Sequence, residues 1–302
     1  MTDILMKNNL SLLTKAVRWL KIKSAEFERL LGAVKRLGLF SALVRFRILE
    51  LSIYALIYPI TRIALGRERA SKICESLIKT PSLTVFPFPH PLTSKLVIKD
   101  HGGWSVAMEI FINDIYQKDT IRKGMNIVDV GAHIGGHTVF FAEKTGNAGK
   151  VIAIEPESKN YEELLGNIHF NNFKNVIPIN AALSDQNGVE KLYISPSSAG
   201  HSLLPELAKN SKTSPFIKIQ VKKLDTLLEE LHIKKIDVLK IDAEGAELRI
   251  LKGAKRTLEN NPHIKIFVAS YHYLGEIQEV QDFLGRLNFK SKVSPFDIVI
   301  TT

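Results

Sequence analysis

The sequence predicts an α/β protein organised around a doubly wound, mostly parallel β-sheet. One observation is an apolar, β-branched run at residues 127–130, followed by a glycine-rich turn at 131–136 and then by apolar residues at helical spacing. The other is a second apolar run at residues 151–154 that ends in Glu155, 24 residues beyond Gly131. A strand, a glycine-rich turn, a helix and a second strand that ends in an acid form the first half of a nucleotide-binding fold.

The remaining elements follow from the same patterns. Short apolar runs bounded by turn residues predict strands at residues 96–98, 176–179, 189–194, 216–221, 236–241, 264–269 and 296–300. Apolar residues at three- and four-residue steps predict helices at residues 106–117, 158–170, 224–231, 248–258 and 277–287. Ser158 is the expected N-cap of its helix.

Composition limits the class of protein. The chain has 302 residues, of which 45% are hydrophobic and 24% charged, as expected for one large domain with an appendage. The single cysteine, Cys74, excludes an internal disulfide, and no Cys/His cluster has the spacing of a zinc site. No secretory signal is expected at the N-terminus, so the sequence favours a reducing, cytoplasmic location.

Residues 1–80 differ from the rest of the chain. They hold 15 Lys/Arg against 6 Asp/Glu, whereas residues 81–302 hold 26 against 25. Apolar positions at residues 10–34 predict amphipathic helices, and charges interrupt the apolar segment 37–65 before it reaches the roughly 20 residues of a bilayer span. We expect a basic helical extension that packs on the main domain or on a second subunit, or that lies on the inner membrane surface. The proline-rich segment 80–92 is the expected boundary.

The glycine spacing distinguishes between cofactors. A dinucleotide-binding loop needs glycines at positions one, three and six, but here His133 stands third, and Gly135 and Gly136 follow. A sulfonium nucleoside has no pyrophosphate to bind, so the sequence favours S-adenosylmethionine over NAD. An acid at the second strand would accept ribose hydroxyls, and a polar pair after the third strand would lie near adenine or form an ordinary turn. The predicted cofactor residues are Asp129, Gly131, His133, Gly135, Glu155, Pro156, Ser184, Asp185 and Asp242.

Candidate catalytic residues follow two later strands. Asp242 and Glu244 come after the strand at 236–241, and His272 comes after the strand at 264–269. Parallel strands end at the same edge of the sheet, so we expect these three side chains to orient an acceptor and accept its proton. Helix capping by the acids and a purely structural histidine are the alternatives. Asp242 and Glu244 could offer two metal ligands, but no third is evident, so the sequence favours metal-independent transfer.

Three stretches, residues 128–136, 180–185 and 239–247, resemble the FkbM family of S-adenosylmethionine-dependent methyltransferases. The resemblance covers roughly residues 95–302. It implies a class I methyltransferase fold, Rossmann-like with seven strands, and methyl transfer to a hydroxyl oxygen of a sugar, lipid-linked glycan or other small metabolite. His133 stands where such proteins more often have Asn.

Two rival functions remain. An RNA methyltransferase could use the basic N-terminal segment to bind phosphates, but the sequence lacks an Asn/Asp-Pro-Pro-aromatic tetrad, and nucleic acid is a disfavoured partner. A membrane-associated binding protein with a degenerate cofactor fold is the other rival, and the intact glycines with Glu155 argue against it. The sequence leaves the oligomeric state open.

Overall fold

The computed structural model describes residues 84–88, 92–98, 116–208 and 215–302. The chain divides into two compact units, residues 1–84 and 85–302. The predicted extension at residues 1–80, with its membrane or subunit contact, lies outside the described residues, as does nearly all of the helix predicted at 106–117. None of the helices in the described part of the chain has the length and apolar content that a bilayer span needs.

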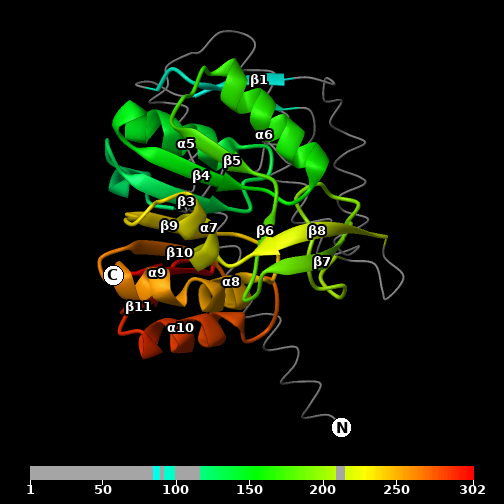
Figure 1. The fold of residues 1–302 in the computed structure, drawn as a ribbon, viewed down its shortest axis with the longest axis vertical. Helices are drawn as coiled ribbons and strands as arrows, with labels where there is room; N and C mark the ends of the chain where they lie inside the picture. The colour runs from blue at the N-terminus through cyan, green and yellow to red at the C-terminus, as the bar shows by residue number, and fades with distance from the viewer. Residues whose placement is uncertain (1–83, 89–91, 99–115, 209–214) are drawn as a thin grey trace, which may run out of the picture. The chain divides into compact units, whose positions relative to one another are not determined.

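A seven-stranded mixed sheet forms the centre of the second unit (Figure 1). Its strands lie in the order β11 (Ser291–Val293), β12 (Ile298–Thr301), β10 (Lys265–Ala269), β9 (Val238–Ile241), β3 (Asn126–Val130), β4 (Lys150–Ile154) and β5 (Val176–Ile179). The five strands from β10 to β5 are parallel, and β12 runs antiparallel to both of its neighbours. Strand order reverses between β3 and β9, which confirms the predicted doubly wound sheet and places its switch point there.

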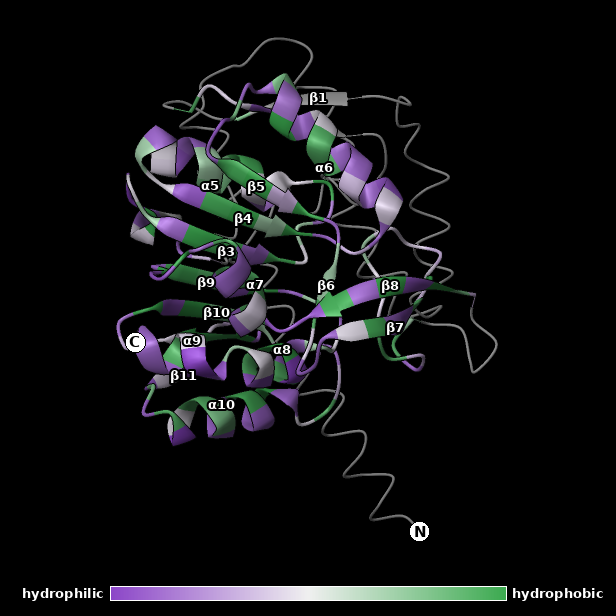
Figure 2. Cartoon of the chain, in the orientation of Figure 1, coloured by the Kyte–Doolittle hydropathy of each residue, from purple (hydrophilic) through white to green (hydrophobic). Residues whose placement is uncertain are grey.

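Helices cover both faces of this sheet because successive strand residues point to opposite sides. On one face, Ile127 and Val151 pack with α5 (Gly136–Thr145), and Ala153 packs with α6 (Ser158–Phe170). On the other face, Val128 and Ile152 share a core with α7 (Leu224–Glu230), α8 (Glu247–Gly253), α9 (Lys255–Asn260) and α10 (Glu276–Arg286). The central strands are accordingly apolar along much of their length, as Figure 2 shows.

Smaller elements complete the unit. A second sheet has the order β6 (Ala182–Leu183), β8 (Phe216–Lys222) and β7 (Gly188–Tyr193), and β1 (Thr84–Pro87) pairs with β2 (Lys95–Ile98). Two 3₁₀ turns, η2 (Lys118–Thr120) and η3 (Gly146–Ala148), precede β3 and β4. The sequence did not predict β6 or β11.

Two local predictions were wrong. The N-cap of α6 is Glu157, whose carboxylate accepts a hydrogen bond from the Asn160 N–H at 2.8 Å, and Ser158 is already the first helical residue. The helix predicted at 248–258 is two helices that meet at Ala254, where ψ is 6°.

Candidate active site

The glycine turn after β3 lies directly against the loop after β9. Gly131 has φ +73°, and a Cβ there would stand 1.8 Å from the Asp242 carbonyl oxygen. The Asp242 N–H donates to the Val130 carbonyl at 3.1 Å, which fixes the two loops together. Gly135, at φ +92°, approaches α6 so closely that a Cβ would lie 2.7 Å from Leu164 Cδ1. Only glycine permits both approaches.

His133 occupies a left-handed backbone conformation, with φ +52°. Asn and His are among the few non-glycine residues that tolerate this region, which explains why either type can stand at this position. Its backbone N–H donates to Glu155 Oε2 at 2.9 Å, and its Nε2 lies 3.0 Å from Ser198 Oγ. The residue therefore joins the glycine turn to the segment after β7.

Glu155 directly follows β4, and its carboxylate is buried. Oε1 accepts the Glu157 N–H at 3.0 Å, and Oε2 accepts the His133 N–H. Burial raises the pKa of Glu155 to about 7, although these hydrogen bonds oppose the shift. Each carboxylate oxygen can accept two hydrogen bonds, so Oε2 retains a lone pair for a further donor. A ribose hydroxyl could be that donor. Asn180, which follows β5, donates to the carbonyls of Glu155 at 2.9 Å and Pro156 at 3.2 Å.

Asp129 lies wholly inside the protein. Its Oδ1 is 3.0 Å from Lys240 Nζ, and its Oδ2 accepts from the Thr138 hydroxyl at 2.6 Å. Lys240 also donates to the Gly131 carbonyl at 2.9 Å. The carboxylate thus ties β9 and α5 to the glycine turn. Direct contact between Asp129 and a cofactor stays a prediction, and the contacts described here join Asp129 to α5 and, through Lys240, to the glycine turn.

The carboxylate of Asp185 has a protein partner. Arg249 Nε donates to its Oδ1 at 3.1 Å, and the guanidinium also binds Glu190 through two nitrogens, at 2.9 and 2.6 Å. Ser184 Oγ donates to the same Asp185 oxygen at 3.0 Å. Partial burial works in the opposite direction, but Arg249 and Ser184 hold the pKa of Asp185 below its usual value. An adenine contact by Ser184 or Asp185 stays a prediction.

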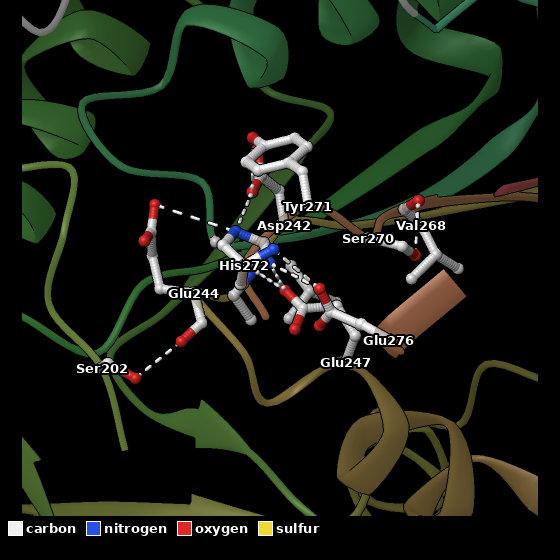
Figure 3. Close-up of polar contacts among 12 residues, drawn as sticks. Ser202, Asp242, Glu244, Glu247, Val268, Ser270, Tyr271, His272 and Glu276 are labelled. Atoms are coloured by element: carbon white, nitrogen blue, oxygen red, sulfur yellow. Dashed lines mark hydrogen bonds and ion pairs between the residues drawn. The ribbon is translucent and has the colours of Figure 1, made fainter. Parts of the chain in front are cut away.

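His272 lies at the centre of a cluster of carboxylates, as Figure 3 shows. Its Nε2 is 3.6 Å from Asp242 Oδ1 and 3.9 Å from Glu244 Oε1. Its Nδ1 is 3.5 Å from Glu247 Oε1 and 3.3 Å from Glu276 Oε2. Burial alone would lower the pKa of His272, but the surrounding carboxylates, Asp242 and Glu276 above all, raise it to about 11.

Two tyrosines complete the surroundings of Asp242. The Tyr116 hydroxyl donates to Oδ2 at 3.3 Å, and the Tyr271 hydroxyl donates to Oδ1 at the same distance. Burial opposes ionisation of Asp242, but His272 and Lys240 outweigh it and lower the pKa of this carboxyl. The half-exposed ring of Tyr271 lies 4.5 Å from that of His272, so aromatic surface adjoins the acids.

The structure brings together the three side chains that the sequence predicted as catalytic, Asp242, Glu244 and His272. It adds Glu247 and Glu276, both fully buried. Sequence reasoning missed Glu276. The available signal was its spacing of four residues from His272, together with its place in the first turn of α10. Such a group of acids and a histidine can orient a nucleophile and accept its proton.

Comparison with known proteins places this geometry in context. The chain is 28% identical to methyltransferase sdnD of Sordaria araneosa, over 49% of this chain and 67% of that protein. It is 25% identical to the hexuronic acid methyltransferase AglP of Haloferax volcanii, over 65% of this chain and 74% of that protein. A crystal structure of an FkbM methyltransferase from Methylobacillus flagellatus is 16% identical with a TM-score of 0.44; the match covers 67% of this chain and about half, 55%, of that one.

The family model for the methyltransferase FkbM domain matches residues 129–291, from the end of β3 to the start of β11. This segment includes the end of β3, and it includes β9 and β10 with the acids and the histidine that follow them. The match spans more than half of the chain, and the chain therefore belongs to the FkbM family of methyltransferases.

Proposed function

We propose that this protein transfers a methyl group from S-adenosylmethionine to a hydroxyl oxygen of a sugar, glycan or other small metabolite. The observation that carries the proposal is the contact between the glycine turn and the Asp242 loop, where a Cβ on Gly131 would meet the Asp242 carbonyl at 1.8 Å. A cofactor at the turn and an acceptor at the acids would therefore be neighbours. The similarity to an enzyme that is named for hexuronic acid supports a sugar acceptor.

Residues of the glycine turn and β4 would hold the cofactor. Glu155 would accept ribose hydroxyls through the free lone pair of Oε2. When bound, S-adenosylmethionine supplies an electrophilic methyl group on a sulfonium. Asp129 and Lys240 would keep the glycine turn in place for this contact.

Asp242, Glu244 and His272 would serve the acceptor. The Glu244 carboxylate is about one-third exposed and is the most accessible acid of the cluster. Glu244 would therefore act as the general base that accepts the proton of the acceptor hydroxyl. Glu244 has φ +50°, an unfavourable conformation for its type, and the Ser202 hydroxyl holds its carbonyl at 2.6 Å. Asp242 and His272 would orient the hydroxyl toward the methyl group.

The test is methyl incorporation from radiolabelled S-adenosylmethionine into fractionated cell extract. Label is expected in glycan, lipid-linked sugar or small metabolites, and label in RNA would favour the rival enzyme. Asp242→Asn is expected to lower turnover by at least about 100-fold while changing cofactor affinity little. Glu259→Gln, an exposed change on α9, is the matched control. Calorimetry that shows no binding of S-adenosylmethionine to the full chain would defeat the proposal.

A further inference from the structure

Three side chains, two of which follow β9 and β10 and one of which begins α8, have the composition of a metal site. Asp242, Glu247 and His272 each offer one ligand atom, and these atoms lie within 4.8 Å of one another. Metal–ligand bonds of about 2.0–2.2 Å place ligand atoms roughly 3–4 Å apart around a first-row cation. A small inward movement of these side chains would therefore complete the coordination. Asp242 and His272 follow the paired strands β9 and β10, and Glu247 is the first residue of α8, which follows β9 in the chain.

Buried polar atoms without hydrogen-bond partners gather at the same place. The His272 side chain is only 4% exposed, and neither ring nitrogen makes a hydrogen bond. Glu247 Oε2 and Glu276 Oε1 are also buried without hydrogen-bond partners. Buried polar atoms in folded proteins nearly always have a partner, and an absent ion is one recognised reason for an exception. Four such atoms in one cluster point to a ligand.

The charges of the cluster favour a cation. Four carboxylates, those of Asp242, Glu244, Glu247 and Glu276, surround a single imidazole. The nearby Lys240 forms an ion pair with Asp129 at 3.0 Å, outside this group of carboxylates. Uncompensated charge is costly in a buried site, and a divalent cation would offset it.

We propose that Asp242, Glu247 and His272 bind a divalent transition-metal ion. One imidazole nitrogen with two carboxylate oxygens suits Mn²⁺, Fe²⁺ or Zn²⁺ better than Ca²⁺ or Mg²⁺, which prefer oxygen alone. This revises the sequence-based expectation of metal-independent transfer. That expectation considered Asp242 with Glu244 and lacked a third ligand, whereas in the structure Glu247 and His272 supply the ligands beside Asp242.

The consequence for catalysis rests on the proposed function. A cation at this position would polarise an acceptor hydroxyl, whose proton would pass to Glu244. The oxygen–carbon bond would then form as the carbon–sulfur bond breaks, leaving a neutral thioether. Ion binding itself requires no methyl transfer, so the two proposals can be tested separately.

The experiment is a titration of the full-length protein with MnCl₂, after treatment with a chelator and desalting. We expect one Mn²⁺ per chain by calorimetry, with a matching change in the electron paramagnetic resonance signal. Glu247→Gln is expected to weaken binding by at least about tenfold, and Gln retains a carbonyl oxygen for the Ala243 N–H that Glu247 now accepts at 2.7 Å. The matched control, Glu259→Gln on the exposed side of α9, removes a carboxylate outside the cluster and is expected to bind Mn²⁺ within about twofold of the parent protein.

Thermal unfolding gives a second readout. Mn²⁺ should raise the Tm of the parent protein and leave that of Glu247→Gln and His272→Gln unchanged, because only bound ion stabilises the fold. The inference is overturned if neither MnCl₂ nor ZnCl₂ gives saturable binding, or if Glu247→Gln binds as the parent does. Glu247 would then be neutralised by sharing a proton with Glu276. Calorimetry with S-adenosylmethionine alone tests the proposed function independently of these outcomes.

Discussion

Replacement of Lys240 by Met tests whether the buried ion pair with Asp129 holds the glycine turn at residues 131–136 in place. The two side chains are 2% and 0% exposed, and Lys240→Met would leave the Asp129 carboxylate with the Thr138 hydroxyl as its remaining close partner. Removing one member of a buried pair typically costs about 3–5 kcal/mol, because the other charge stays buried without compensation. The Gly131 carbonyl would lose a donor as well.

The double variant measures the interaction energy between Asp129 and Lys240 separately from the cost of changing each residue. Asp129→Asn with Lys240→Met removes both charges, so it should cost no more than either single change, which gives a coupling energy of about 3 kcal/mol. Urea unfolding followed by circular dichroism supplies each free energy. The exposed pair Lys255–Glu259, at 3.8 Å, is the control, and Lys255→Met should cost less than about 0.5 kcal/mol. The reasoning would be refuted if the losses in unfolding free energy of the two single variants added up in the double variant. It would also be refuted if Lys240→Met cost no more stability than Lys255→Met.

Two further predictions concern Gly131 and Glu155, which we propose hold the cofactor. Gly131→Ala should weaken S-adenosylmethionine binding at least about tenfold in calorimetry, because its Cβ would force the Asp242 loop away; Gly166→Ala, in open space on α6, should bind normally and gain up to about 1 kcal/mol of stability. The pKa of Glu155 is raised from 4.5 to about 7, so the folded protein binds more protons than the unfolded chain between these values. The free energy of unfolding should therefore fall by about 3 kcal/mol as pH rises through that window, while cofactor affinity increases, because the carboxylate is the better acceptor for ribose hydroxyls. Unfolding and calorimetry between pH 5 and 8 check both trends, and parallel trends in Glu155→Gln would contradict them.

Most strands and helices could be predicted because their apolar periodicity is local. The two-residue β6 could not, since it exists only through pairing with Val221 and Lys222 on β8. The break between α8 and α9 is also a tertiary effect. A Cβ at Gly253 would lie 2.0 Å from the Ser184 carbonyl, so the segment after β5 lies directly against the C-terminal end of α8. The apolar pattern continues through residue 258 and gives no sign of this contact.

Convergence of Asp242, Glu244 and His272 could be predicted for a general reason. Parallel strands that follow one another in a doubly wound sheet end at one edge, so residues just past them become neighbours. Glu276 does not follow a strand. An acid in the first turn of a helix is commonly explained by the helix dipole, and nothing local shows that it accepts the His272 N–H at 2.8 Å.

Asp129 shows the limit of pattern reasoning most clearly. The motif around Gly131 suggests a free carboxylate for the cofactor, yet Asp129 is paired in register with Lys240 on β9. Both side chains point to the face that α5 covers, so each neutralises the other. This pairing depends on the register between strands more than 100 residues apart, which periodicity leaves undetermined. The ion pair of Asp129 and Lys240 therefore holds the glycine turn in place, while Asp242 and Glu244 beyond β9 lie beside His272. Substitutions of Asp129 or Lys240 should reduce stability more than turnover, and substitutions of the acids beyond β9 should reduce turnover more than stability.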